Sequence, residues 1–95
     1  GTHLMLITSE LAEALEADRH NITANRVSFS KEFSETGDFA KAFKKNIKDS
    51  YEDEIADAVI RILDHWGYKG IDIERHVAQK LKYNKTREIR HGKKY

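Results

Sequence analysis

Residues 51–64 read Tyr51-Glu-Asp-Glu-Ile-Ala-Asp-Ala-Val-Ile-Arg-Ile-Leu-Asp64, and this stretch decides the fold. Its apolar positions recur every three or four residues, which predicts an amphipathic α-helix with a buried stripe of Ile55, Val59, Ile62, Leu63 and Trp66. Glu54 and Asp57 stand three residues apart, so on a helix their carboxylates project from one face and can share a cation. That face lies away from the apolar stripe, so a metal site needs a second element to cover it.

Residues 4–19 provide a candidate for that second element. They predict a helix, because apolar side chains recur at helical intervals at Leu4, Ile7, Leu11, Ala14 and Leu15. Glu10 and Glu13 repeat the three-residue spacing and fall on an arc that also carries apolar residues. A solvated acidic face that includes Glu16 explains the same residues equally well.

The rest of the chain predicts two more helices and one long loop. Residues 20–36 show no sustained period and are expected to form the loop, with Phe29 and Phe33 either pinning it to the core or stacking on a ligand base. Asp38, Ser50 and Asp72 are expected N-caps, and Gly67 is the expected end of the residue 51–64 helix. The helix after Asp38 carries an apolar stripe and a lysine face for solvent or phosphate, and the last helix is expected to end near residue 83.

Composition bounds the class of protein. A chain of 95 residues with 39% apolar and 35% charged residues fits one small all-α domain over residues 1–95, neither disordered nor membrane-spanning. The absence of cysteine excludes disulfides and thiolate metal sites and suits a cytoplasmic location. A net charge of +1 argues against general nucleic-acid binding. A further N-terminal helix is expected to precede the given sequence, because the first helix begins without a lead-in.

Ordered motifs in this chain resemble those of one enzyme family. They are Ser9-Glu-Leu-Ala-Glu-Ala-Leu-Glu16, the residue 54–64 stretch, Lys80-Leu-Lys-Tyr-Asn-Lys-Thr-Arg87 and Arg90-His-Gly-Lys-Lys94. Together they resemble the MazG-like all-α nucleoside triphosphate pyrophosphohydrolases, which include dimeric dUTPases and dCTP pyrophosphatases. The resemblance implies an enzyme that removes or balances cellular nucleotides by cleaving (d)NTP to (d)NMP and pyrophosphate.

The resemblance also implies a site. Metal ligands would be Glu10, Glu13, Glu54 and Asp57, with Glu54, Asp57 and Glu13 as the catalytic candidates. The expected ion is Mg²⁺, with Mn²⁺ as a substitute, because all-oxygen ligands suit hard cations. Substrate phosphate or sugar would contact Lys80, Asn84 and Arg87. Relatives form homodimers or homotetramers, so a four-helix-type bundle completed by oligomerisation is expected.

Two differences from the family pattern are visible. Ile7 stands where many relatives have a glutamate, so the register of the first motif remains open between Glu13 and Glu16 as the compensating acid. The interval between Glu13 and Glu54 is also longer than usual. The alternative function is a non-catalytic helical binding module, in which the basic tail at residues 85–95 contacts nucleic acid or an acidic protein. A family relative that has lost catalysis is a third possibility.

Overall fold

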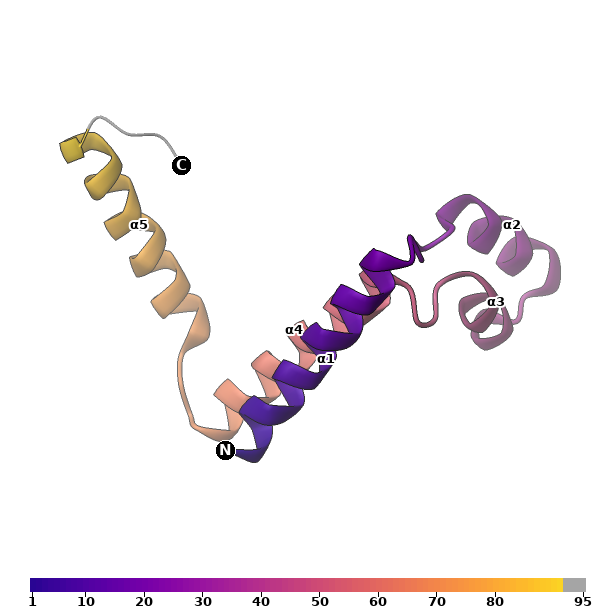
Figure 1. The fold of residues 1–95 in the computed structure, drawn as a ribbon, viewed down its shortest axis with the longest axis horizontal. Coiled ribbons are helices and arrows are strands. Elements are labelled where there is room, and N and C mark those ends of the chain that lie inside the picture. The colour runs from indigo at the N-terminus through magenta and orange to yellow at the C-terminus, as the bar shows by residue number, and fades with distance from the viewer. Residues whose placement is uncertain (92–95) are drawn as a thin grey trace. The chain divides into compact units, whose positions relative to one another are not determined.

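The structure is a computed structural model that describes residues 1–91, with the side chains of residues 1–87, and all regular structure in this range is helical. The helices are α1 (Thr2–Arg19), α2 (Arg26–Thr36), α3 (Phe39–Asn46), α4 (Tyr51–Tyr68) and α5 (Ile73–His91) (Figure 1). The all-α prediction is therefore confirmed, whereas the oligomeric bundle stays a prediction. No helix in the described range combines the length and apolar character needed to cross a membrane.

The chain divides into two compact units, Gly1–Ile62 and Leu63–Tyr95, which are described separately. In the first unit, α1 and the first part of α4 run antiparallel. The backbone N–H of Tyr51 donates to the carbonyl oxygen of Ile22 at 2.8 Å, just beyond the end of α1. At the other end of the contact, the Arg61 Nε of α4 donates to the Glu10 Oε1 of α1 at 2.9 Å.

Small side chains fill the contact between these two helices. The buried apolar residues of α1 are Ile7, Ala14 and Ala17, and that of the facing part of α4 is Ala58. The predicted buried stripe of α4 is therefore wrong at Val59 and Leu63, which are about half exposed. Because interaxial distance depends on the side chains at the contact, alanines allow the two helix backbones to approach closely. The same approach brings the longer acidic side chains of the two helices within reach of one another.

The predicted long loop at residues 20–36 is wrong over most of its length, because residues 26–36 form α2. The side chain of Asn25 caps this helix by accepting from the Ser28 N–H at 3.0 Å. Only two large apolar side chains of α2 face its partner, so the helix has little periodicity of its own. Their packing partners come from α3, and the four rings form one cluster of Phe29, Phe33, Phe39 and Phe43.

The predicted N-caps of the later helices are confirmed. Asp38 Oδ1 accepts from the Lys41 N–H at 3.1 Å, and Asp72 Oδ1 accepts from the Arg75 N–H at 3.0 Å. Ser50 Oγ accepts from the Asp53 N–H at 3.2 Å. The predicted end of α4 at Gly67 is wrong, because the helix continues to Tyr68 and the chain turns at Gly70, whose φ is +68°.

The second unit contains the end of α4, a short turn and α5. Trp66 and His76 form an edge-to-face ring contact across this turn, with centroids 6.3 Å apart. The predicted end of the last helix near residue 83 is wrong, because α5 extends to His91. Lysine and arginine are good helix formers, so the first part of the predicted basic tail continues the helix. Lys93 and Lys94 lie outside the described residues.

Two glycines should respond in opposite ways to replacement by alanine. Gly37 ends α2 with a φ of +68°, and an added Cβ there would meet no other atom, so Gly37→Ala tests backbone strain alone. We expect it to lower the free energy of unfolding by about 1 kcal/mol. Gly67 lies inside α4, where an added Cβ would also meet no other atom. Gly67→Ala should therefore raise the free energy of unfolding by roughly 0.5 to 1 kcal/mol. Urea unfolding followed by circular dichroism measures both, and equal changes of the same sign would contradict the assignment.

Candidate metal centre

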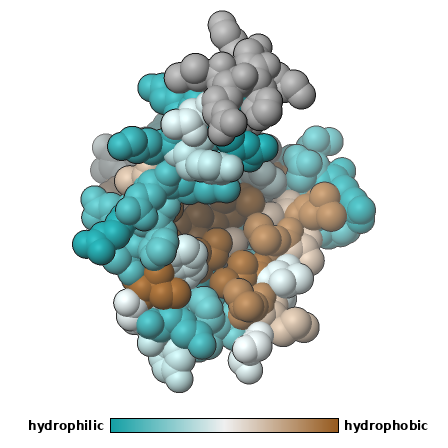
Figure 2. All heavy atoms as spheres, turned by 90° about the vertical axis from the view of Figure 1, so that its left-hand side faces the viewer, coloured by the Kyte–Doolittle hydropathy of each residue, from teal (hydrophilic) through white to brown (hydrophobic). Residues whose placement is uncertain are grey.

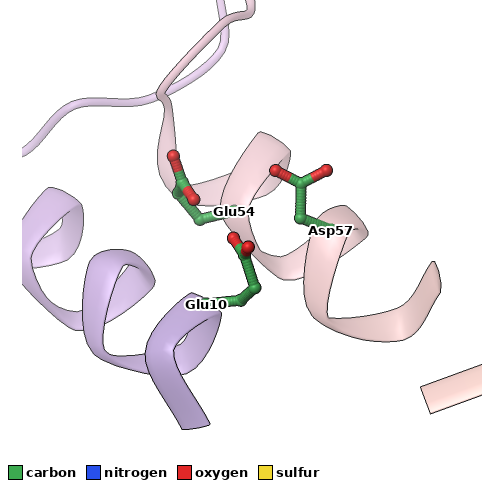
Figure 3. Close-up of side chains that lie close together, drawn as sticks. All are labelled: Glu10, Glu54 and Asp57. Carbon is green, nitrogen blue, oxygen red and sulfur yellow. The ribbon is translucent and has the colours of Figure 1, made fainter. Parts of the chain in front are cut away.

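An acidic cluster lies where α1 and α4 cross in the first unit. Figure 3 shows Glu10 reaching from α1 toward Glu54, with Asp57 beside it on the same face of α4. One carboxylate oxygen from each of the three residues lies within 4.8 Å of the other two. The Glu13 carboxyl also reaches the cluster and forms a hydrogen bond with that of Glu54. The structure therefore brings three of the four predicted ligands, Glu10, Glu54 and Asp57, within reach of one ion, whereas Glu13 lies outside this group.

Glu54 is the most perturbed carboxyl of this group. Its side chain is buried, with 7% of its surface exposed, beside the alanine-rich contact of the two helices. Burial, the hydrogen bond to Glu13 and the negative charges of Glu13, Glu10 and Asp57 raise its pKa from 4.5 to about 7. Desolvation is the largest of these causes, because a charge loses more by leaving water than a neutral acid does. Near neutral pH the Glu54 carboxyl is therefore close to the midpoint of its titration.

Asp57 shares the same environment with one compensating charge. Desolvation raises its pKa, and the charges of Asp53, Glu10 and Glu13 raise it further, while the Arg61 guanidinium lowers it. Arg61 is also the hydrogen-bond partner of Glu10, at 2.9 Å. The sequence analysis assigned no function to this arginine. Its position four residues after Asp57, on the acidic face of the helix, was the available signal.

A second acidic group adjoins the first and shares Glu54. Oxygens of Asp49, Asp53 and Glu54 also lie within 4.8 Å of one another. Asp49 has a φ of +65°, its backbone N–H donates to Asp53 Oδ2 at 2.9 Å, and its own carboxylate accepts from Lys48 Nζ at 3.1 Å. The sequence analysis assigned no function to Asp49 or Asp53. Their spacing of four residues was the missed signal.

The donor set of the cluster fits a hard divalent cation. Within the described part of the chain, both groups of potential ligands consist of carboxylates alone, and Mg²⁺ and Mn²⁺ prefer oxygen ligands. Like charges held this close destabilise one another, and the charges of Glu13, Glu10 and Asp57 add to burial in raising the pKa of Glu54. A bound cation would remove that repulsion, so the crowding that costs stability also favours metal binding.

The three predicted substrate contacts lie in the second unit, on α5. Lys80, Asn84 and Arg87 recur at helical intervals and so share one side of this helix. Tyr83 lies between the two cations, with Lys80 Nζ 5.2 Å and the Arg87 guanidinium carbon 5.8 Å from its ring centroid. Cation–π contacts of this kind hold long side chains in place. Their role toward a substrate stays a prediction.

The fold and the site thus define an all-α protein with a cluster of carboxylates shared between two helices. Comparison of the chain with models of protein families, with curated proteins and with solved structures finds no match. The chemistry of the acidic cluster and the order of the sequence motifs are therefore the grounds for assigning a function.

The raised pKa of Glu54 predicts a specific pH dependence of stability without metal. Between pH 4.5 and about 7 the folded protein holds a proton on Glu54 that the unfolded chain releases, so stability should fall as pH rises through this window. Because glutamine is neutral at every pH, Glu54→Gln should abolish this decrease in the free energy of unfolding, which is on the order of 2 kcal/mol. Urea unfolding at several pH values in the presence of a chelator measures it. Glu35→Gln, an exposed glutamate of α2, is the control and should follow the wild-type profile.

Proposed function

We propose that this protein is a Mg²⁺-dependent nucleoside triphosphate pyrophosphohydrolase that cleaves (d)NTP to (d)NMP and pyrophosphate. The observation that carries the proposal is the convergence of Glu10, Glu54 and Asp57 oxygens within 4.8 Å of one another from two helices. The resemblance of the ordered motifs to MazG-like enzymes supports the choice of reaction. A role in removing or balancing nucleotides follows from the same resemblance.

The residues of the cluster have distinct tasks in this proposal. Glu10, Glu54 and Asp57 hold Mg²⁺, with Mn²⁺ as a substitute, and Arg61 orients the Glu10 carboxylate through its 2.9 Å hydrogen bond. Bound Mg²⁺ supplies charge neutralisation of the triphosphate and lowers the pKa of a coordinated water. Glu13, which is exposed but hydrogen-bonded to Glu54, is placed to accept a proton from an attacking water.

Positive charge for the substrate comes from α5 in this proposal. Lys80 and Arg87 contact phosphate, and Asn84 offers an amide for phosphate or sugar. Charged donors stabilise the negative charge that develops on the leaving pyrophosphate. The two cations are already held against the Tyr83 ring, so less side-chain freedom is lost when an anion binds.

We also propose that the active form is a homodimer or homotetramer. The space-filling view shows apolar side chains at the surface among hydrophilic ones (Figure 2). In the first unit, large apolar residues of both α1 and α4 are about half exposed: Leu4, Leu11, Leu15, Val59 and Ile60. Large exposed apolar patches mark interaction sites, and a second copy of the chain would bury these residues.

One observation favours the alternative of a non-catalytic helical binding module. Exposed cations occur along α5 and on more than one side of it, at Lys80, Lys82, Lys85 and Arg87. Such a helix could bind nucleic acid or an acidic protein without any reaction at the carboxylates. Phosphate-driven binding of an oligonucleotide would fall steeply with added salt.

The first test of the enzyme proposal is a panel of nucleoside triphosphates with Mg²⁺. We expect monophosphate and pyrophosphate as products, and Glu54→Gln should lower turnover by at least about a hundredfold, because a ligand of the ion is lost. Calorimetric titration should show stoichiometric Mg²⁺ uptake by the wild type and none by the variant.

The control for this test is Glu35→Gln, which should keep both turnover and Mg²⁺ uptake. Circular dichroism should show equal helicity in all three proteins. Absence of turnover on the whole panel, together with absence of Mg²⁺ uptake, would refute the enzyme proposal. Salt-sensitive oligonucleotide binding would then support the alternative module.

The oligomer proposal predicts that a charge placed on the apolar side of α1 dissociates the oligomer. Leu15→Lys, on the apolar side of α1, should shift the mass from oligomer toward monomer in size-exclusion chromatography with light scattering, because a buried charge without a partner destabilises an interface. Val27→Lys on α2, at a residue that is 82% exposed, is the matched control and should leave the mass unchanged. A monomeric wild type would contradict this prediction.

A further inference from the structure

A groove of about 690 Å³ lies between α3 and α4 in the first unit. Its size falls in the range of sites for small molecules. Apolar side chains line it: Phe39 and Phe43 from α3, Ile47 directly after α3, and Ala56 and Ile60 from α4. Phe39 and Phe43 are stacked with centroids 6.0 Å apart and an interplanar angle of 22°. The lining therefore includes a pair of nearly parallel aromatic rings.

Charged residues of the two signs occupy opposite walls of this groove. Arg26, Lys44 and Lys48 contribute positive charge from the α2–α3 side, while Glu52, Asp53 and Asp57 contribute negative charge from α4. A ligand that matches both walls needs an apolar planar part, anionic groups for the lysines and a cation-binding end for the carboxylates. These are the features of a nucleotide bound with a divalent cation.

Asp57 connects the groove to the candidate metal centre. It lines the groove, and its carboxylate oxygen also lies within 4.8 Å of those of Glu10 and Glu54. A phosphate chain that begins in the groove therefore ends beside the carboxylates. Among the residues that the sequence analysis assigned to the site, Asp57 alone lines this groove, so the other lining residues are new to the site.

We infer that the α3–α4 groove binds the nucleobase of a nucleotide, with the base against Phe39 and Phe43 and the phosphates passing Lys44 toward Asp57. This inference rests on the proposed function and adds the part of the site that selects the ligand. Stacking of a base on an aromatic side chain contributes about 1 to 3 kcal/mol, so the groove supplies affinity that phosphate contacts alone lack.

Nuclear magnetic resonance titration of the metal-free protein tests the groove independently of catalysis. One probe is a nucleoside monophosphate, either uridine 5′-monophosphate or adenosine 5′-monophosphate. The other is ribose 5-phosphate, which has the sugar and phosphate but no base. We expect the monophosphate to shift the amide signals of Lys44 and Ala56, with a Kd about tenfold lower than that of ribose 5-phosphate. Equal Kd values, or shifts confined to other residues, would overturn the inference.

Variants that fill the groove provide the second arm. Ala56 is exposed in the groove, so Ala56→Leu adds volume there without removing a core contact, and it should raise the Kd for the monophosphate about tenfold. Ala78→Leu, at an exposed helical alanine of α5 outside the groove, should leave it unchanged. Lys44→Ala should weaken both probes, whereas Lys41→Ala on the same helix, outside the groove, should weaken neither.

The outcomes separate the groove from the proposed reaction. Wild-type turnover with an unchanged KM in Ala56→Leu would overturn the groove assignment and leave the enzyme proposal standing. Base-dependent shifts at Lys44 and Ala56 in a protein without turnover would support the groove and refute the reaction. A KM raised about tenfold in Ala56→Leu, with KM unchanged in Ala78→Leu, would support both.

Discussion

Burial of the Glu54 carboxyl between α1 and α4 is the constraint on which the first unit depends. The carboxyl lies among three other acids at a contact otherwise filled by alanines, and its pKa rises to about 7 as a result. A leucine at this position would pack without that penalty. The chain instead keeps an ionisable group where ionisation costs stability, and perturbed carboxyls of this kind cluster at functional sites.

Two features stabilise the cluster without a cation: the positive charge of Arg61 and a proton on Glu54. The guanidinium binds Glu10 at 2.9 Å and lowers the pKa of Asp57, so it offsets part of the repulsion. Glu54 offsets more of the repulsion by retaining a proton, which its hydrogen bond with Glu13 favours. A bound Mg²⁺ would take over both tasks, which links metal binding to proton release. The same carboxylates thus affect stability, pH dependence and the proposed chemistry.

The α2–α3 segment gives this acidic cluster a neighbouring surface for a ligand. Its four phenylalanines pack on one another, and the backbone N–H of Asn25 donates to the carbonyl oxygen of Asn46 at 2.9 Å, which joins the ends of the segment. This packing holds Phe39 and Phe43 beside α4. The groove that results lies next to Asp57, so the proposed base site and the proposed metal site share one residue.

Local chemistry was sufficient to predict α1, α3, α4 and α5, most of the N-caps and the residue types of the site. Periodic apolar residues indicated α1 and α4, and the three-residue spacing placed Glu54 and Asp57 on one face, because helical geometry is fixed over short distances. The caps at Asp38, Ser50 and Asp72 follow from the same local rules. The candidate ligands Glu10 and Glu13 follow from the same spacing together with the resemblance of the ordered motifs.

Only the tertiary structure decided which of these residues meet. The sequence could not show that Glu10 lies against Glu54 and Asp57, because residues more than 40 positions apart are brought together by helix packing. Nor could it identify α2, whose apolar residues pack on those of α3, or the groove beside Asp57. The sequence by itself thus determined α1, α3, α4 and α5 and the acidic faces of α1 and α4. Packing of alanines between α1 and α4 decided that those faces form one site, because only close backbone approach brings the carboxylates within reach of a shared cation.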